Sequence, residues 1–552
     1  MISAIKFITN RLILLICFFP FISESQNFTN AGQIHGSFEM DAQYYMKDSL
    51  IGAPDVPQKM LMNAFANILY TNGNFSAGVR YESYQDVLQG YDSRNVGNGI
   101  PYKFISYKSD ELEVTVGNFY EQFGNGLVLR LYQDWSLGVD NSVEGVKVVY
   151  KPFKGVTIKA LAGTQRFFFE QGPGIVRAAD GEFYLNDIFK GLENKKTKIT
   201  VGGSVVSKYQ DKSDPVYNLP ANVAAFDGRA NIVCGKINFV SEYAYKVNDP
   251  SLLNNYIYKP GDALYTSATF SQKGLGISVS ADRIDNMGFQ SDRTATGNVL
   301  YINYLPSLPT EHTYQLEAMY PYATQPNGEM GEQGTISYNI KRNTALGGRY
   351  GTDVTVNYSR VSSIDMEAVN DTTPIGENGT LGYKSDFSKF GKELYYDDFN
   401  VEIDHKFSQR FKADLSYMYQ TYNKEIIQGH PPTIYAHIGV LDLTYKLKEK
   451  KSFQLELQHL YTREENGSWA MAMLQYTIAP KWFFAVSDMY NYGNSDDVMR
   501  INYYNATFGF IKNTNRIAIG WGKQRAGIFC VGGVCRYVPA SNGFSLSIMS
   551  SF

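Results

Sequence analysis

The last ten residues of the chain, 543–552, alternate between two kinds of side chain. One parity is large and apolar and the other is small and polar: Phe544, Leu546, Ile548 and Phe552 against Ser545, Ser547 and Ser551. A period of two predicts a β-strand, and its unlike faces predict that the strand lies between two different media. A soluble sandwich could end in the same way, so the pattern has to recur along the chain.

The alternation recurs in residues 33–47. One parity is apolar or small and the other is polar: Ile34, Gly36, Phe38, Met40, Ala42, Tyr44 and Met46 against Gln33, His35, Ser37, Glu39, Asp41, Gln43 and Lys47. Residues 399–420 and 453–462 show the same two faces. A charge that faces lipid near the bilayer midplane costs roughly 2–4 kcal/mol, so we expect the polar sets to face a lumen.

Short and long connections alternate between the predicted strands. Tight turns are expected at Asn72-Gly73, Ser109-Asp110, Lys273-Gly274, 408–410, 448–450 and 512–514. Longer segments are expected at 87–102, 121–142, 165–181, 210–222, 284–296, 322–334, 361–397 and 529–542. Such sorting of short turns and long loops is typical of membrane β-barrels, with the turns periplasmic and the loops facing outward.

We therefore predict an all-β fold, a transmembrane antiparallel up-and-down β-barrel of about 26 strands, within a range of roughly 22–26. Residues 26–552 are predicted to form this one domain, because no linker or change of composition marks a boundary. The least regular strands are expected at 183–192 and 344–359. Mean hydropathy is −0.28, which fits strands that are only half apolar.

Residues 1–25 are predicted to be a signal peptide that is cleaved near Ser25. Lys6 and Arg11 give a basic start, and residues 12–19 form an apolar centre too short to span a bilayer. Cys17 could mark a lipoprotein, but the preceding Ile16 is bulky and apolar residues continue beyond it. The formal net charge of −3 gives no electrostatic case for a nucleic-acid partner.

Three stretches, 117–124, 348–352 and 530–539, resemble a set of large Gram-negative outer-membrane β-barrel proteins of unassigned function. The terminal strand also resembles that of bacterial outer-membrane barrels, in which the final Phe is a recognition signal. The resemblance implies an outer-membrane location, contact with membrane lipid, and recognition of the Phe552 strand by the barrel-insertion machinery. It brings no activity with it.

Seven residues are candidates for lining the lumen: His35, Glu39, Asp41, Glu402, Asp404, Lys412 and Asp414. His35 with Glu39 and Asp41 could form a catalytic or cation site, but lining a wet pore is the preferred interpretation. The turn at 408–410 places Asp404 opposite Asp414. Because like charges across a strand pair are unfavourable, a basic neighbour, a cation or water must offset them. An acidic constriction would favour cations.

Two segments, 119–130 and 166–174, are too apolar for ordinary solvated loops. Phe123 and Arg130 in the first, and Arg166 and Phe168 in the second, are candidates for occluding the lumen. We expect both segments to fold inward and narrow the barrel. The alternative is that they cap the rim or hold a partner.

Cys530 and Cys535 are expected to form a disulfide, with Cys234 left free at the opposite end of the barrel. A redox pair or metal site at the two cysteines is the alternative. The six histidines show no metal-ligand spacing, and no HExxH or GxSxG motif occurs. We therefore expect no cofactor, no metal and no enzymatic activity.

The preferred function is a porin-like channel for small polar solutes whose lumen is partly occluded by outer loops. The alternative is a non-conducting barrel that serves as a subunit of a secretion, surface-assembly or gliding complex, with periplasmic or surface proteins as partners. A barrel protease or lipase is the third hypothesis, and it lacks a cluster of Ser or Asp with His near one rim.

Overall fold

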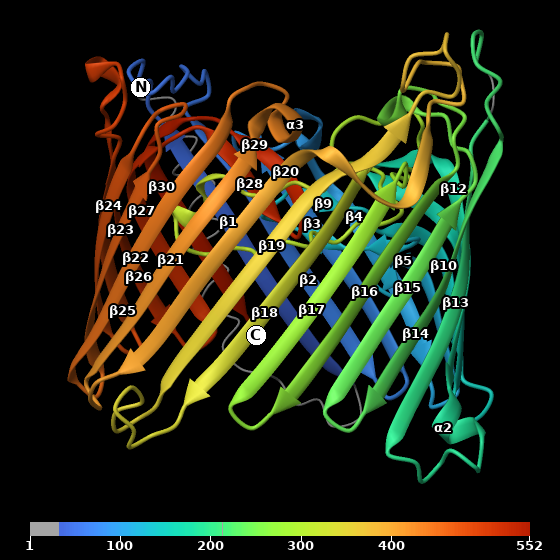
Figure 1. Ribbon diagram of the computed structural model, residues 1–552, viewed down its shortest axis with the longest axis horizontal. Coiled ribbons are helices and arrows are strands. Elements are labelled where there is room, and N and C mark those ends of the chain that lie inside the picture. Colours follow the sequence, from blue (N-terminus) through green and yellow to red (C-terminus); the bar gives the residue numbers. More distant parts are fainter. Residues whose placement is uncertain (1–31, 212–213) are drawn as a thin grey trace.

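The computed structural model describes residues 32–211 and 214–552, so the predicted signal peptide lies outside the described residues. Twenty-four antiparallel strands form one closed sheet (Figure 1). The first twelve wall strands are β1 (Gln33–Tyr45), β2 (Met60–Asn72), β3 (Phe75–Gln85), β4 (Gly97–Lys108), β5 (Leu112–Phe119), β10 (Val143–Tyr150), β11 (Val156–Phe167), β12 (Glu170–Tyr184), β13 (Thr197–Tyr209), β14 (Asn222–Cys234), β15 (Ile237–Lys246) and β16 (Gly261–Gln272). The other twelve are β17 (Leu275–Asp285), β18 (Glu329–Ile340), β19 (Thr352–Glu367), β20 (Lys384–Lys406), β21 (Phe411–Asn423), β22 (Thr433–Lys448), β23 (Lys451–Tyr461), β24 (Trp469–Ile478), β25 (Trp482–Tyr490), β26 (Asn502–Lys512), β27 (Asn515–Gln524) and β30 (Ser541–Ser551).

Among the described residues, six more strands and six short helices lie in the connections. The strands are β6 (Glu121–Gln122), β7 (Arg130–Leu131), β8 (Gln133–Asp134), β9 (Val139–Asp140), β28 (Gly527–Val531) and β29 (Val534–Val538). The helices are α2 (Leu185–Ile188), α3 (Lys424–Gln428), η2 (Ser93–Asn95), η3 (Leu252–Asn254), η4 (Glu317–Met319) and η5 (Asp497–Met499). Among the described residues, no helix is long and apolar enough to cross a lipid bilayer.

The ring closes between the first and last wall strands. β1 pairs with β30 from Ser37 opposite Ser551 to Tyr45 opposite Gly543. Backbone bonds of 3.0 Å in both directions join Gly36 to Phe552. A side chain at position 36 would meet the Phe552 ring, because an added Cβ would lie 2.2 Å from it. Glycine at position 36 thus leaves room for the terminal aromatic ring over β1.

The strand count of 24 lies within the predicted range and just below the central value. Residues 183–192, expected to be a strand, form the end of β12, the helix α2 and a turn. The predicted outer loops 284–296 and 322–334 belong largely to one connection, 286–328, which contributes no strand to the wall. Its sequence lacks the period-two pattern of the wall strands.

Tight turns gather at one end of the barrel and the longer connections at the other (Figure 1). All six predicted tight turns connect consecutive strands. Outward positions carry exposed apolar side chains such as Ile105, Val279 and Ile34, which are 64%, 55% and 60% exposed. The apolar faces therefore point away from the lumen, as a lipid-facing wall requires.

The expectation of an outer loop at 165–181 is wrong. β11 and β12 run through most of this stretch and turn at Phe168 and Phe169. Its backbone groups pair across the hairpin, with a register shift between Thr164 and Arg166. Glycine and aromatic residues suggested a loop, but the cross-strand pairing decides the structure.

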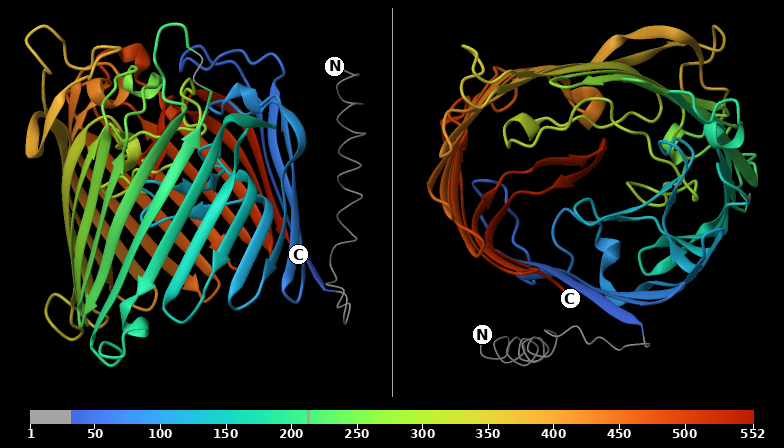
Figure 2. Two further views of the ribbon diagram at one scale, coloured as in Figure 1. Left: turned by 90° about the vertical axis from the view of Figure 1, so that its right-hand side faces the viewer. Right: turned by 90° about the horizontal axis from the view of Figure 1, so that it is seen from below.

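Three charged residues near the loop end break the apolar parity of the outer wall. Arg283 and Asp285 share the parity of the exposed Val279, and Asp262 lies directly opposite Asp285. Arg283 is 2% exposed and Asp285 0%, because the connection between β19 and β20 covers them. We call residues 368–391 the outer flap, and Figure 2 shows this hairpin outside the ring of strands.

Contacts between the outer flap and the wall are polar as well as aromatic. The Tyr383 hydroxyl donates to Asp285 Oδ1 at 2.6 Å, and the Ser385 hydroxyl donates to Asp285 Oδ2 at 2.5 Å. The Arg283 guanidinium lies 4.7 Å from the centre of the Phe387 ring. The flap thus supplies the partners that lipid cannot, and charges are tolerated on this part of the outer wall.

Replacing Val279 by arginine tests the orientation of the wall. We expect Val279→Arg to lower the free energy of unfolding from lipid vesicles by roughly 2–4 kcal/mol, because the charge would face lipid. Ser278→Arg, one residue away on the lumen side, is the matched control and should change the free energy little. Equal effects of the two variants, measured by urea titration, would contradict the assigned faces.

Candidate functional site

Three connections from the loop end lie within the ring of strands (Figure 2). The first inner segment is residues 120–142, with the small hairpins β6–β7 and β8–β9. The second inner segment is residues 286–328, and the third is residues 525–540, with the hairpin β28–β29. All three are held to the wall or to one another by contacts that define their positions.

The first inner segment is anchored by apolar side chains. Phe123, Val128 and Leu129 are each 0% exposed. They share one apolar cluster with inward-facing wall residues: Leu161, Val176, Ala178, Val206, Ala225, Ala244 and Ala263. Burying one large apolar side chain is worth about 1.5–3 kcal/mol, so this segment is a packed part of the fold. The wall is lined by small residues here, which leaves room for the segment.

The second inner segment packs at both of its ends. Phe289 and Ile302 join the same cluster as Phe123. Near its other end, four residues pack against the inner faces of β19–β25: Leu316, Met319, Tyr320 and Tyr322. Backbone bonds of 2.9 Å from Arg130 N to Ile302 O and from Tyr304 N to Gly126 O join it to the first inner segment.

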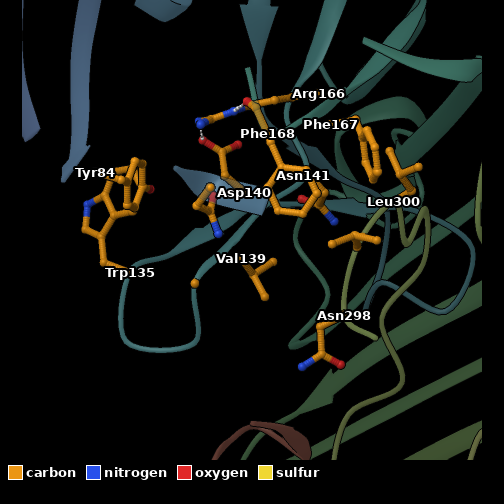
Figure 3. A pocket seen from close by; sticks show the side chains of 13 residues that line it. Tyr84, Trp135, Val139, Asp140, Asn141, Arg166, Phe167, Phe168, Asn298 and Leu300 are labelled. Carbon is orange, nitrogen blue, oxygen red and sulfur yellow. Dashed lines mark hydrogen bonds and ion pairs between the residues drawn. The ribbon is translucent and has the colours of Figure 1, made fainter. Parts of the chain in front are cut away.

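A buried group of ion pairs fixes the first inner segment to the wall. Arg80 and Glu82 come from β3, Arg166 from β11 and Asp140 from β9. Arg166 binds Glu82 Oε2 at 2.6 Å and Asp140 Oδ2 at 2.7 Å, and Arg80 binds Glu82 Oε1 at 2.7 Å. Arg80 also pairs with Asp140. Figure 3 shows Arg166 beside Asp140.

The two guanidinium and two carboxylate charges balance in this group, so the buried charges are compensated. Burial alone would raise the pKa of Asp140, but the charges of Arg166 and Arg80 outweigh it and hold that pKa below its ordinary value. The Tyr120 hydroxyl adds a hydrogen bond of 3.1 Å to Asp140 Oδ2.

Two buried lysines of the wall hold the second inner segment. Lys208 Nζ binds Asp249 Oδ2 and donates to Gln290 O, both at 2.7 Å. Lys246 Nζ donates to Gly288 O at 2.5 Å. Both side chains are almost fully buried, and their ammonium groups bind backbone carbonyls of the second inner segment.

The third inner segment closes onto the second at its turn. The Tyr304 hydroxyl donates to Gly532 O at 2.6 Å, and Thr324 N donates to Gly533 O at 3.2 Å. Both glycines have positive φ, of 57° and 80°. An added Cβ would lie 2.0 Å from the Tyr304 hydroxyl at position 532 and 2.2 Å from Thr324 Oγ1 at position 533. Only glycine fits this tip.

A disulfide joins Cys530 to Cys535 across the same turn. Cys234 is free and exposed. Asn298 Nδ2 donates to Cys535 O at 2.6 Å, so the hairpin is fixed both by its covalent bond and by the second inner segment.

A cavity of about 200 Å³ lies where the three inner segments meet. None of its lining residues is charged, and they include Tyr132, Asn298, Tyr301, Tyr304 and Thr324. Burial raises the pKa of Tyr301 to about 12. The neighbouring cavity in Figure 3, beside Asp140 and Trp135, measures about 30 Å³ and has room for one water molecule.

Carboxylates form a row across the inner face of five neighbouring strands. Directly opposed in register are Asp353, Asp404, Asp414, Asp442 and Glu456, from β19 to β23. Lys412 Nζ lies 2.6 Å from Asp404 and 2.9 Å from Asp414 and offsets that pair. We call these five residues the carboxylate row. Asp353, Asp404 and Asp414 lie close to the tight-turn end of their strands.

His312 links the second inner segment to the acidic side of the wall. Its Nε2 lies 2.6 Å from Asp398 Oδ2, and its Nδ1 lies 3.8 Å from Glu317 Oε2. Burial alone would lower the pKa of His312, but the hydrogen bond and charge of Asp398, with Glu317, raise it above its ordinary value. The protonated imidazole is therefore the form that binds the second inner segment to Asp398 of the wall more strongly.

The predicted lumen residues occupy two separate parts of the wall. His35, Glu39 and Asp41 share the inward parity of β1. The others, Glu402, Asp404, Lys412 and Asp414, lie on β20 and β21, where Asp404 does face Asp414. The structure does not bring the two sets together. Among the described residues, no three His, Cys, Asp or Glu side chains form a group that could hold a metal ion.

The candidates for occluding the lumen have different positions. Phe123 and Arg130 lie in the first inner segment, and Arg130 stacks 3.9 Å from the Tyr304 ring. Residues 166–174 do not form an inner loop, because Arg166 belongs to wall strand β11 and Phe168 to the turn after it, but both line the small cavity beside Asp140. Arg166 acts from the wall, by pairing with Asp140 of the segment that does fold inward.

Sequence reasoning missed the second inner segment and the partners of Arg166. Arg80 and Glu82 alternate with Val79 and Tyr81, a pattern that predicts two inward charges. Nothing local predicts that Asp140 reaches them, because this contact joins residues 60 positions apart.

Replacing Asp140 by asparagine tests the anchor of the first inner segment. We expect Asp140→Asn to leave Arg80 and Arg166 with an unbalanced buried charge, which costs roughly 3 kcal/mol or more. Amide hydrogen exchange within residues 120–142 should accelerate, while the barrel retains its heat-dependent electrophoretic mobility. Glu144→Gln at the outer rim is the control. Unchanged exchange in Asp140→Asn would refute the anchor.

The raised pKa of His312 predicts a pH dependence. A raised folded-state pKa gives stabilisation that is complete below the unfolded value of about 6.5 and lost as pH rises through the folded value. Hydrogen exchange of residues 306–322, corrected for intrinsic rates, should therefore show loosening as pH rises from about 5.5 to 8.5. His312→Gln should abolish this step. The same step in both proteins would show that another group titrates.

Several solved structures resemble this chain, with about 10% sequence identity. Curated protein sequences give no match. The P pilus usher PapC translocation pore is 10% identical, with a TM-score of 0.43 over 94% of this chain and 99% of that chain. A mutant of the ferric enterobactin receptor PfeA from Pseudomonas aeruginosa is 10% identical, with a TM-score of 0.41 over 94% of this chain and 81% of that chain. OpdQ of Pseudomonas aeruginosa is 9% identical, with a TM-score of 0.32 over 83% of this chain and 96% of that chain.

A family model described as a family of unknown function matches residues 7–552. This match covers the whole barrel, from β1 to β30. The chain therefore belongs to the family of unknown function DUF6029.

Proposed function

We propose that this protein is an outer-membrane channel for small polar solutes, narrowed at the loop end by the three inner segments and selective for cations. The observation that carries the proposal is the carboxylate row, which places five acids on one stretch of lumen wall with Lys412 as the neighbouring cation. Opposed like charges are destabilising across a strand pair, and Lys412 lies against two of the five acids.

The row supports cation selectivity by simple electrostatics. An ion that passes within about 10 Å of one carboxylate in water gains or loses about 0.4 kcal/mol, according to its sign. Three such charges at the tight-turn end and the opposite charge of Lys412 leave a net charge of about −2, so a cation gains and an anion loses about 0.8 kcal/mol. The difference of about 1.6 kcal/mol is roughly a fifteenfold bias towards cations before screening by salt. The row thus favours cations without binding them tightly, as conduction requires.

The inner segments define the narrow part of the proposed path. Their apolar and ion-pair anchors make them fixed obstacles, so passage at the loop end would follow the spaces left beside them. The proposal assigns the chain no catalytic role and no cofactor. Membrane lipid around the wall, and the insertion machinery at the Phe552 strand, are its proposed partners.

A second candidate function is a non-conducting barrel that serves as a subunit of a secretion, surface-assembly or gliding complex. One observation favours it: the three inner segments are bonded to one another, through Ile302, Tyr304 and Gly532. Such mutual bonding could seal the lumen and leave the exposed loops to hold a partner.

Planar-bilayer recording of the purified protein tests the proposal. We expect discrete conductance and, in a salt gradient at low ionic strength, a reversal potential that shows cation preference. A triple variant with Asp353, Asp404 and Asp414 changed to Asn should lose most of that preference, because Lys412 is then left without its two acids. Asp386→Asn on the outer flap is the matched control. Silence together with co-purifying proteins would favour the subunit, and conductance without cation preference would refute the role of the row.

A further inference from the structure

The cavity at the junction of the three inner segments is lined by residues that suit an uncharged polar molecule. Its lining residues come from all three segments and include no acid, lysine, arginine or histidine. A charged ligand would lose its hydration there without a countercharge among the lining residues, which is unfavourable. The Arg130 guanidinium lies outside the lining, over the Tyr132 and Tyr304 rings at 4.7 and 3.9 Å from their centroids, and it disfavours a cation further. The chemistry of the wall therefore selects against ions, in contrast to the carboxylate row.

Several polar groups of this wall are free to bind a ligand. Within residues 32–211 and 214–552, the hydroxyls of Tyr132 and Tyr301 make no hydrogen bond. The buried Thr324 hydroxyl also lacks a partner among the described residues. The amide nitrogen of Asn298 donates to Cys535 O, and its amide oxygen accepts no hydrogen bond from any described residue.

These free groups both donate and accept hydrogen bonds, since a hydroxyl does either and an amide oxygen accepts. A purely apolar occupant would leave them unsatisfied, which costs about 1–3 kcal/mol for each buried group. The ligand should therefore carry hydroxyl or amide groups on several sides.

Aromatic rings also line the cavity. The rings of Tyr132 and Tyr304 meet edge to face, with centroids 6.1 Å apart, and both belong to the cavity wall. The volume of about 200 Å³ is more than ten times the roughly 10–15 Å³ that one enclosed water molecule needs. This is room for one hydroxylated six-membered ring.

We propose that this cavity binds a neutral, hydroxyl-rich ring of monosaccharide size, free or at the end of a glycan. The tyrosine rings provide apolar surface, with Arg130 over one face of Tyr132 and one face of Tyr304. The free hydroxyls and the amide oxygen of Asn298 provide the hydrogen bonds. The tip of the disulfide hairpin, through Gly533 and Val534, forms one wall. This site goes beyond the channel proposal, because binding is expected whether or not the barrel conducts.

Saturation-transfer difference NMR on the full barrel in detergent micelles tests the site. D-glucose, D-galactose and myo-inositol are the neutral probes, and D-glucuronate and D-glucosamine are the charged ones. We expect saturation of at least one neutral probe at about millimolar concentration, and at least fivefold weaker saturation of both charged probes. Failure of all three neutral probes, or equal saturation of charged probes, overturns the proposal.

Variants locate the binding within the cavity. Tyr301→Phe should weaken binding about three- to tenfold, because one hydrogen bond is lost while the ring remains. Ala323→Leu places a larger side chain in the cavity wall and should abolish binding. Tyr314→Phe, on the same inner segment but away from the cavity, is the control and should bind as the parent does. Heat-dependent mobility establishes that each variant is folded.

The outcome for Ala323→Leu decides the location, since undiminished binding in that variant would place the sugar elsewhere and overturn the site. A silent barrel that still binds a neutral probe in a Tyr301-dependent way would refute the channel and support this cavity. A conducting barrel that binds none of the probes would do the reverse.

Discussion

Lipid offers no hydrogen bonds to a backbone, and this constraint governs the whole structure. Every strand that crosses the membrane must find partners on both sides, so the sheet has to close on itself. Closure depends on β1 and β30, whose registered pairing joins residues near the two ends of the described chain. The Phe552 ring over Gly36 adds a side-chain contact at the seam, and no open edge remains in the sheet.

Closure with 24 strands creates a second requirement, because such a ring encloses more space than its own side chains can fill. The inner segments occupy part of it, and the wall is adapted to them. Where they pack, the inward positions are small and apolar, as at Ala225, Ala244 and Ala263. Toward the tight-turn end the inward positions of β19–β23 carry the carboxylate row. The inner face of the wall thus has an apolar part that packs against the inner segments and a polar part that carries the carboxylate row.

Charges mark the places where this barrel departs from a simple two-faced wall. Asp262, Arg283 and Asp285 point outward, where Arg283 pairs with both acids and Asp285 also accepts a hydrogen bond from Tyr383 of the outer flap. Lys208 and Lys246 are buried inside the wall, where they hold the backbone of the second inner segment. The outward charges show where the outer flap is docked, and the complete burial of the two inward lysines shows where the second inner segment is docked. Parity exceptions in such sequences are therefore informative about tertiary contacts.

The sequence by itself determined the wall. Alternation with a period of two sets which residues of β1, β20, β21, β23 and β30 face lipid, because each strand meets two media, and the tight turns set the register that opposes Asp404 to Asp414. Tertiary structure alone decided the interior. Residues 286–328 have no periodic pattern, and Asp140 meets Arg80 and Arg166 only after distant strands are brought together by closure. Local patterns record the medium that a strand faces, whereas the lumen is filled by contacts between segments that no local pattern connects.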